Sequence, residues 1–289
     1  MLIAGFPSGV FAANCYVVAP GAGEECVIID PGQDAEAGIE EILTAQRLKP
    51  AAVLLTHGHL DHVWSVAPVC GAKDIPAYIH PADRVLLSDP AKGFPLAQGQ
   101  QLFGGLEFTE PDDVRELTDG MTLDLVGLSI VVDHAPGHTE GSVAFRLPSA
   151  AEAAAAGASR SMVPSIAVNE DSSGPSDMDG AIHSGGGRAA TAGGRGAGAA
   201  GAGGSTGGGS TAGEAGVMFS GDLLFAGSIG RTDLPGGDHR AMLRSLARVC
   251  LTLPDETIVL SGHGPQTTIG AERRGNPFLH GMKPAPRGL

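Results

Sequence analysis

Short apolar runs that end at turn residues alternate along the chain with segments whose apolar residues recur every three or four positions. The apolar runs 26–29 and 52–56 are of the first kind. Segment 35–48 is of the second kind, because Ile39 and Leu43 fall on one side of a helix. Bounded apolar runs predict strands, and the spacing of three to four predicts a helix. This part of the chain is therefore predicted as strand, helix and strand.

The same patterns continue to the end of the chain. Helices are predicted at 60–69 and 238–253, the second with arginines opposite its apolar face. Further strands are predicted at 77–80, 129–133, 142–147, 218–220 and 257–261. The apolar N-terminal segment lacks basic residues at its start and is interrupted by Pro7, Gly9 and Asn14, so we predict strand and turn there and no signal peptide. This order of strands and helices predicts a layered domain of both.

The composition changes sharply between residues 148 and 216. Within 185–216, 24 of 32 residues are Gly or Ala. Such a segment buries too little apolar surface to offset the entropy of ordering it, so we expect a flexible insert at 148–216. The folded domain would then comprise 1–147 and 217–289, with the strands that flank the insert paired as a hairpin. We expect the insert to leave this hairpin at the tip that lies far from the histidine-rich segments of the chain.

Charge and cysteine content narrow the class of protein. The net charge is −14, from 18 basic and 32 acidic residues, which argues against binding to nucleic acid or to an anionic membrane surface. No apolar run reaches about 18 residues, so no membrane-spanning helix is expected. The four cysteines form no CxxC pair, so we expect neither a zinc knuckle nor a disulfide scaffold, and a reducing cytoplasm fits best.

The densest group of candidate metal ligands directly follows the predicted strand 52–56. It reads His57-Gly58-His59-Leu60-Asp61-His62. Alternate residues of an extended chain share a face, so His57 and His59 should project the same way. The following turn would bring Asp61 and His62 beside them. Four nitrogen and oxygen ligands within six residues suit a borderline metal such as zinc better than a merely hydrogen-bonded polar loop.

Three more segments each place one candidate ligand at the end of a predicted strand. They are His138 in the sequence PGHTEGS, Asp222 in SGD and His263 in SGHGP. Glycines flank all three residues and allow close approach of the backbone. These segments strengthen the prediction of a metal site.

Taken together, the HxHxDH, PGHTEGS, SGD and SGHGP segments resemble the metallo-β-lactamase superfamily. Segments 225–237, 264–270 and 276–278 resemble the glyoxalase II-like thioesterases (hydroxyacylglutathione hydrolases), especially their short bacterial forms. The resemblance covers the whole chain except the insert. It implies an α+β class and an αββα sandwich, with the metals at one edge of the two sheets.

The resemblance also implies the ligand set. One metal would bind His57, His59 and His138, and the other would bind Asp61, His62 and His263. Asp222 would bridge both, and the catalytic residues would be Asp61 and Asp222. The branch of lactamases with a cysteine at a metal position is disfavoured because Asp222 holds that position. Two divalent ions are implied, with zinc expected and iron or manganese as alternatives.

The reaction implied by the resemblance is hydrolysis of a small 2-hydroxyacyl thioester of the S-lactoyl type, by attack of a metal-bridging hydroxide. A thiolate leaves readily, so no dedicated general acid is required, and the sequence has no GxSxG motif outside the Gly/Ala-rich insert. Larger glyoxalase II enzymes carry a C-terminal helical domain that helps to hold glutathione. Here about 25 residues follow His263, too few for that domain. Glutathione, another small thiol and coenzyme A therefore all remain open as the carrier.

Other activities share parts of this pattern. A persulfide dioxygenase holds one iron with two His and one Asp and shares the HxHxDH run. A lactonase or general hydrolase would use the same metals. A metal-dependent binding module is disfavoured by the full ligand set, and a nuclease is disfavoured by the acidic charge.

Several polar residues near these motifs have open roles. Asp30 would either bond the HxHxDH loop or cap a turn, and Asp133 and His134 would either orient ligands or pair at their strand end. For Arg231 we favour fixing the loop after Asp222 over gripping a substrate carboxylate. Two residues are predicted to have only structural roles: His80 is expected in a turn, and Trp64 in the core near the site.

Overall fold

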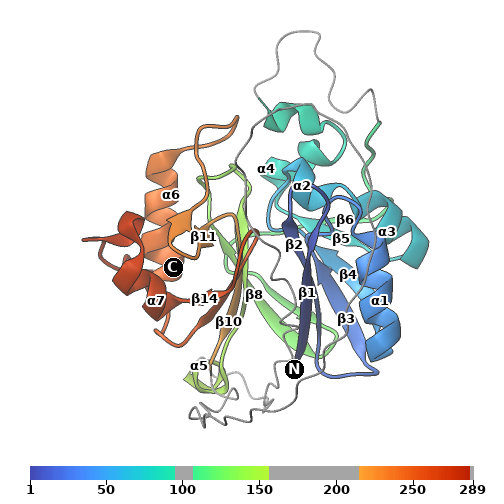
Figure 1. Ribbon diagram of the computed structural model, residues 1–289, viewed down its shortest axis with the longest axis horizontal. Coiled ribbons are helices and arrows are strands. Elements are labelled where there is room, and N and C mark those ends of the chain that lie inside the picture. The colour runs from blue at the N-terminus through green and yellow to red at the C-terminus, as the bar shows by residue number, and fades with distance from the viewer. Residues whose placement is uncertain (95–106, 156–214, 287–289) are drawn as a thin grey trace, which may run out of the picture. The chain divides into compact units, whose positions relative to one another are not determined.

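Two six-stranded sheets form the centre of the protein, and helices cover their outer faces (Figure 1). The computed structural model describes residues 1–94, 107–155 and 215–286. Most of the predicted insert, residues 156–214, lies outside the described residues. The first sheet is formed by strands within residues 2–116, and the second sheet by strands within residues 122–268.

The first sheet has the strand order β1-β2-β3-β4-β5-β6. Strand β2 is antiparallel to both of its neighbours, β1 and β3, and β3 to β6 run parallel. The strands are β1 (Leu2–Ser8), β2 (Ala13–Ala19), β3 (Glu25–Ile29), β4 (Lys49–Leu54), β5 (Ala77–Ile79) and β6 (Val114–Glu116).

The second sheet has the order β14-β13-β10-β9-β8-β7, and its one parallel pair is β10 with β13. Its strands are β7 (Thr122–Leu125), β8 (Leu128–His134), β9 (Val143–Leu147), β10 (Val217–Gly221), β13 (Ile258–Ser261) and β14 (Thr267–Thr268). A small separate hairpin consists of β11 (Leu224–Phe225) and β12 (Ser228–Ile229).

The helices are short, and most connect strands of one sheet. They are α1 (Glu36–Gln46), α2 (Leu60–Val63), α3 (Val66–Lys73), α4 (Pro81–Arg84), α5 (Ala150–Ala155), α6 (His239–Ser245) and α7 (Ile269–Gly275). A π-helical turn, Leu246–Cys250, continues α6. Single 3₁₀ turns lie at Val85–Leu87, Pro90–Gly93 and Pro277–Leu279.

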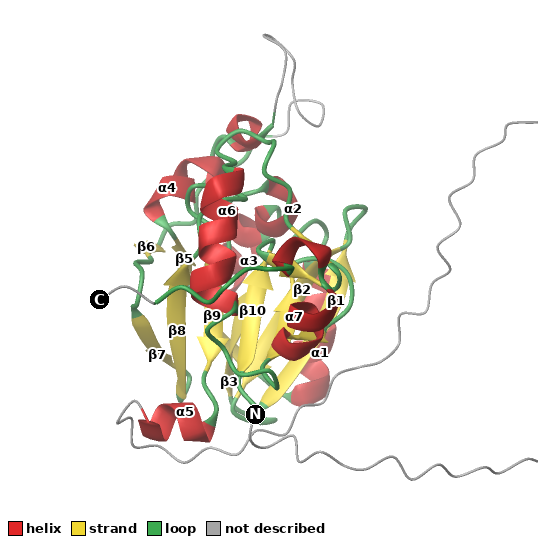
Figure 2. Cartoon of the chain, turned by 90° about the vertical axis from the view of Figure 1, so that its left-hand side faces the viewer, coloured by secondary structure: helices red, strands yellow, loops and turns green. Residues whose placement is uncertain are grey.

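Three apolar clusters hold these layers together. Between the sheets, Leu54 of the first packs with Phe145 and Phe219 of the second, all fully or almost fully buried. Outside the first sheet lies a cluster that includes Ile39 of α1 and Val69 of α3. Outside the second sheet, α6 and α7 contribute a third cluster, and Figure 2 shows both helices in front of that sheet. The expected αββα sandwich of the α+β class is confirmed.

The predicted strands and the helix at 35–48 are found with shifts of one to three residues. The predicted helix at 60–69 is instead two helices, because the backbone N–H of Ser65 bonds the carbonyl of Pro31 and the chain changes direction there. The interrupted N-terminal segment forms the β1–β2 hairpin. The short edge strands β6 and β7 have no counterpart in the prediction, because three or four residues carry too little periodicity.

The strands on either side of the predicted insert pair as the sequence predicts. β9 and β10 are antiparallel, with Leu147 opposite Val217. Beyond β9 the chain continues into α5, where Ser149 Oγ accepts from the N–H of Glu152 and the Glu152 carboxylate accepts from the N–H of Ser149. This reciprocal cap is a recognised start signal for a helix, so ordered structure extends past the predicted boundary at 148.

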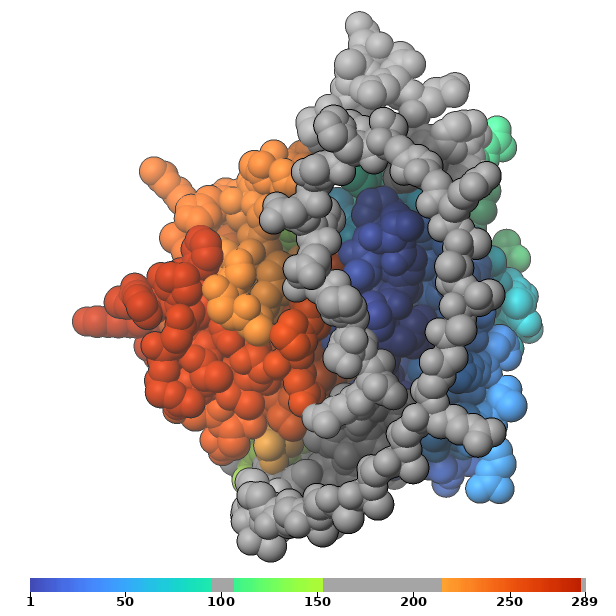
Figure 3. Space-filling model, viewed as in Figure 1, coloured from blue at the N-terminus to red at the C-terminus, as the bar shows by residue number. Residues whose placement is uncertain are grey.

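Residues near the two termini lie on different sides of the face shown in Figure 3. Figure 3 shows residues near the N-terminus in blue on one side and residues near the C-terminus in orange and red on the other.

All four cysteines are buried free thiols. Among the described helices, none has the length and apolar content needed to cross a bilayer.

Candidate metal centre

The seven predicted ligands come from four separate segments of the chain that meet at one edge of the two sheets. His57 and His59 follow β4, and Asp61 and His62 lie on α2. The loop between β8 and β9 carries His138, the residue after β10 is Asp222, and the loop after β13 carries His263. Their donor atoms approach within 4.8 Å of one another in three overlapping groups: His57, His59 and His138; His57, His62 and Asp222; Asp61, His62 and His263.

The first group is a cluster of three buried imidazoles. Nδ1 of His59 lies 2.8 Å from Nε2 of His138. The ring of His57 lies 5.0 Å from that of His59 and 4.7 Å from that of His138, centroid to centroid. We call this cluster the three-histidine group.

The third of these groups contains Asp61, His62 and His263, and we call it the Asp61 group. Oδ2 of Asp61 lies 3.1 Å from Nε2 of His263 and 3.6 Å from Nε2 of His62. The Nε2 atoms of the two imidazoles are 3.3 Å apart. This group is less buried than the first, because the side chain of His263 is 30% exposed.

Asp222 lies between the two groups. Its Oδ1 is 3.5 Å from Nε2 of His62, and its Oδ2 is 3.5 Å from Nε2 of His138. Oδ2 also lies 3.8 Å from Nε2 of His263, so the carboxylate of Asp222 contacts imidazoles of both groups. A carboxylate placed in this way can join two cations through its two oxygens.

Hydrogen bonds on the outer side of three imidazoles decide which nitrogen faces the centre. The hydroxyl of Thr56 donates to Asp30, so it accepts from Nδ1 of His57 at 3.1 Å. Nδ1 of His62 lies 3.1 Å from Oδ2 of Asp30, and Nδ1 of His138 lies 2.8 Å from the carbonyl of Arg231. With Nδ1 donating in each ring, Nε2 of the neutral imidazole has a free lone pair that faces the centre. Metal-binding histidines are oriented in this way.

Two of the inward-facing atoms have no hydrogen-bond partner among the described residues. They are Nε2 of His57 and Oδ1 of Asp222, and both are buried. A buried acceptor without a partner costs free energy, and a cation bound here would satisfy both atoms. Imidazole nitrogens and carboxylate oxygens suit zinc, iron or manganese. The residues present therefore fit a divalent metal site.

The charges of the two groups differ. Burial, together with the neighbouring imidazoles, lowers the pKa of His57 well below its usual range and that of His59 to about 3. These rings are neutral at pH 7, the form that binds metal. Burial alone would lower the pKa of His62, but Asp61, Asp222 and Asp30 raise it to about 10. The carboxylates that favour a proton on His62 also favour a metal cation at the same nitrogen.

Of the residues with open roles, Asp30 orients the centre and Asp133 does not. Asp30 accepts from the backbone N–H of Thr56 at 2.8 Å and from its hydroxyl at 2.6 Å, and it also faces His62. Asp133 instead forms an ion pair with Arg146 on the neighbouring strand. The hydrogen-bonding role of Asp30 is one of its two predicted alternatives, whereas Arg146 as the partner of Asp133 has no counterpart in the prediction.

The other candidate residues lie at the margin of the centre. Nε2 of His134 bonds the carbonyl of Glu140, and its ring stacks on His80 with centroids 4.1 Å apart. His80 caps the start of α4, which agrees with its predicted place in a turn. The guanidinium of Arg231 is exposed and pairs with Asp233, so this residue reaches the centre only through its carbonyl.

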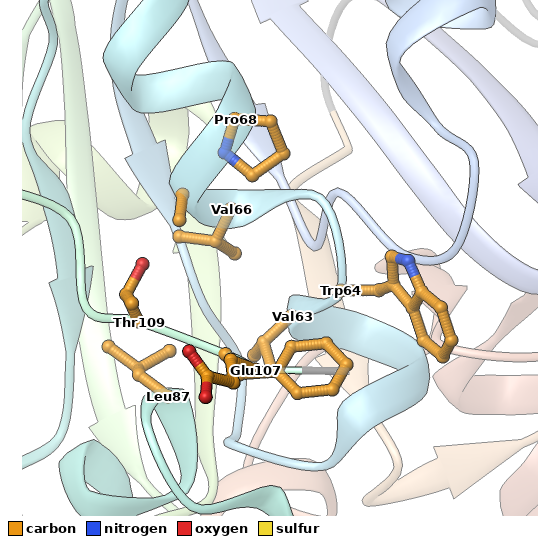
Figure 4. A pocket seen from close by; sticks show the side chains of 9 residues that line it. Val63, Trp64, Val66, Pro68, Leu87, Glu107 and Thr109 are labelled. Carbon is orange, nitrogen blue, oxygen red and sulfur yellow. The ribbon is translucent and has the colours of Figure 1, made fainter. Parts of the chain in front are cut away.

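Trp64 packs against Phe108 beside a pocket of about 220 Å³ (Figure 4). The pocket lies along α2 and α3, and its described lining includes Val63 and Leu87. None of the seven predicted ligands contributes to this lining, so we assign the pocket no role in metal binding.

No pattern in the sequence predicts the residues that hold the His263 loop. The backbone N–H of Asn14 donates to Gly262 at 2.7 Å, and its side-chain amide donates to the carbonyls of Ser261 and Gly264, each at 2.9 Å. The hydroxyl of Tyr16 donates to the same carbonyl of Ser261 at 2.8 Å. Asn14 interrupts an apolar segment, and this position predicts only a turn residue. Its partners lie about 250 positions away and leave no local pattern.

Comparison with protein families and curated proteins gives consistent matches. The family model described as the metallo-beta-lactamase superfamily matches residues 8–150 and 165–263. An uncharacterized protein of Mycobacterium tuberculosis is 42% identical over 283 residues, which cover 98% of this chain and 99% of the relative. The hydroxyacylglutathione hydrolase GloC of Haemophilus influenzae is 28% identical over 277 residues, covering 95% of this chain and 96% of the relative.

Two solved structures are similar along nearly their whole length. The B3 metallo-beta-lactamase BLEG-1 is 34% identical with a TM-score of 0.65, covering 96% of this chain and 100% of that chain. The protein TTHA1623, in a di-iron-bound form, is 34% identical with a TM-score of 0.60, covering 94% and 97%. All four proteins match both parts of the chain that flank the predicted insert.

Proposed function

Because the chain belongs to the metallo-β-lactamase superfamily, we propose that it is a metal-dependent hydrolase that cleaves 2-hydroxyacyl thioesters of the S-lactoyl type, as glyoxalase II does. The observation that carries the proposal is the position of Asp222, with one oxygen toward His62 and the other toward His138. The similarity to a hydroxyacylglutathione hydrolase over almost the whole chain supports the thioester substrate.

We assign one metal to the three-histidine group and one to the Asp61 group, with Asp222 between them. When bound, such a metal pair supplies an activated water at neutral pH and polarises the carbonyl of the substrate. Zinc is the expected metal. Iron is the main alternative, because TTHA1623 is described with two irons. The protein supplies the fixed positions of the ligands and of the charges around them.

The residues of the chain have distinct tasks in this reaction. Asp30, Thr56 and the carbonyl of Arg231 hold three imidazoles with Nε2 inward. Burial opposes ionisation of Asp61, but His62 and His263 outweigh it and lower its pKa, so the carboxylate stays ionised at neutral pH. Asp61 can therefore accept a hydrogen bond from the attacking water. The leaving thiolate needs no proton donor, because a free thiol has a pKa of about 8.5.

Two other reactions remain as outcomes of the same test. BLEG-1 is a B3 metallo-beta-lactamase, so β-lactam hydrolysis is the second candidate. A persulfide dioxygenase with one iron is the alternative from a different class of enzyme. The net charge of −14 favours a small-molecule substrate over nucleic acid, because nucleic acid is itself negatively charged.

The test is hydrolysis of S-lactoyl thioesters of glutathione, coenzyme A and a third small thiol, with protein of measured metal content, before and after treatment with a chelator. We expect turnover that the chelator abolishes and that returned metal restores. The relative kcat/KM values of the three thioesters identify the carrier. Cleavage of a chromogenic β-lactam with no thioesterase activity would contradict the proposal, as would oxygen consumption with a persulfide by protein that holds one iron.

A further inference from the structure

A buried carboxylate outside the predicted ligand set touches two of the loops that form the centre. Asp83 lies on α4 and is only 2% exposed. Its Oδ2 accepts hydrogen bonds from the backbone N–H of Gly58 at 2.9 Å and from the hydroxyl of Thr139 at 2.6 Å. Its Oδ1 accepts from the backbone N–H of Gly141 at 2.8 Å. Three donors therefore converge on one carboxylate.

These donors are neighbours of one half of the candidate ligand set. Gly58 lies between His57 and His59 in the sequence, and Thr139 directly follows His138. Asp83 thus joins the loop after β4 to the loop after β8. It has no recorded hydrogen bond to the Asp61 group, whereas Asp30 bonds His62 in that group.

Both loops are shaped to approach Asp83 closely. A Cβ added to Gly58 would lie 2.8 Å from the backbone oxygen of Asp83, and one added to Gly141 would lie 2.5 Å from its Cγ. Any side chain at either position would force the loop away from the carboxylate. The two glycines and the aspartate therefore form one packed contact, which sets the separation of the two loops.

We propose that Asp83 is a positioning residue that preorganises the three-histidine group and so determines the metal affinity of that half of the centre alone. The inference rests on the proposed metal site, and not on the thioester substrate. The rings of His57 and His59 lie on one loop and that of His138 on another, so a metal would otherwise have to order both loops when it binds. With the loops joined during folding, that entropic cost is already met.

Substitution of Asp83 by Asn isolates this role, because the side chain keeps its size. An amide has one acceptor oxygen and one NH₂ donor. At least one of the three donors around position 83 would then face another donor. Thr139→Val is a milder second variant, because it leaves both backbone bonds to Asp83. It removes the hydroxyl, which bonds Asp83 and also contacts Oγ of Ser142 at 2.7 Å.

The chain offers a matched control in Glu272. This carboxylate on α7 is also buried, at 5% exposed, and it also accepts three hydrogen bonds. Its donors are the backbone N–H of Gly227, the side-chain amide of Asn276 and the hydroxyl of Thr267. None of these donors is a predicted ligand or next to one in the sequence. Glu272→Gln therefore has a comparable cost in stability without loosening the three-histidine group.

The experiment is a competition titration of Zn²⁺ between a chromophoric chelator and each protein, starting from metal-free folded protein and with no substrate present. Anomalous diffraction from crystals grown with limiting zinc then locates the ions. In Asp83→Asn we expect one of the two zinc affinities to fall by about 10–100-fold, the range found when outer partners of metal ligands are removed. The weakened ion should be the one among His57, His59 and His138. Thr139→Val should weaken the same ion less, and Glu272→Gln should leave both affinities unchanged.

The inference is overturned if folded Asp83→Asn binds both ions as the unaltered protein does, if the weakened ion is the one in the Asp61 group, or if Glu272→Gln loses affinity equally. It is also overturned if the unaltered protein binds no zinc in the three-histidine group. An unaltered protein that binds two zinc ions but cleaves no thioester would remove the proposed substrate and leave the role of Asp83 standing.

Discussion

The carboxylate of Asp30 lies 3.1 Å from Nδ1 of His62, and both side chains are almost completely buried. The same carboxylate accepts two hydrogen bonds from Thr56, the residue before His57. Asp30 thereby connects the end of β3 to the end of β4 and to α2. It contacts the Asp61 group directly through His62, and it reaches His57 of the three-histidine group only through the hydroxyl of Thr56.

Asp30→Asn should reduce thioester turnover by about 10–100-fold and should weaken the metal of the Asp61 group. The reason is that an amide cannot accept from Thr56 and His62 with both of its terminal atoms. Zinc content and kcat measured on the same preparation test this. The control is Asp255→Asn, which alters an exposed ion pair with Arg273 and should change neither quantity. Unchanged zinc binding in Asp30→Asn would contradict the role of Asp30.

Asn14→Asp should loosen the loop that carries His263. The replacement carboxylate has no N–H to donate, so it would repel the carbonyls of Ser261 and Gly264 that Asn14 now bonds. We expect a loss of stability of about 1–3 kcal/mol by denaturant unfolding, and weaker binding of the metal in the Asp61 group. If the variant loses stability but keeps both metal affinities, Asn14 supports the fold without positioning His263.

Metal binding at pH 7 should release at least one proton. In the metal-free protein, the pKa of His62 is raised to about 10 by Asp61, Asp222 and Asp30 against the effect of burial, so the ring is protonated at pH 7. A metal ligand must be the neutral imidazole, so the proton has to leave. Affinity should therefore rise with pH, by about tenfold per unit for each proton released. Calorimetric titration of Zn²⁺ in buffers of different ionisation enthalpy measures the number of protons, and a value of zero would show that His62 is not a ligand.

Removal of residues 156–214 should leave activity unchanged. β9 and β10 pair without this segment, and the chain leaves and re-enters the hairpin at the ends opposite His138 and Asp222. A short Gly-rich connection can close the gap at low entropic cost, and the deletion should keep α5 because of the Ser149–Glu152 cap. We expect kcat/KM within about twofold of the full chain, a difference of less than 0.5 kcal/mol in barrier height. A large loss of turnover in folded, metal-loaded protein would show that the segment takes part in the reaction.

The sequence alone was sufficient for the layered fold and for the seven candidate ligands. Strands of five or more residues and the helix of residues 36–46 follow local periodicity, which is a property of neighbouring residues. The ligands are also local in this sense, since each one lies within a few residues of a strand end. Their spacing identified them one segment at a time, without any knowledge of which segments meet.

Only the tertiary structure decided which polar residues hold those ligands in place. Asp30 and Asp133 both end apolar runs, and the sequence left both open as orienting residues. They differ because the register of β8 and β9 places Arg146 diagonally across from Asp133, where it takes up that carboxylate. Asp83 and Asn14 reach partners 25 to 250 positions away, and no local pattern encodes such contacts. The physical reason is that a hydrogen bond between loops depends on how strands are ordered and how sheets pack, and the chain acquires both only when it folds.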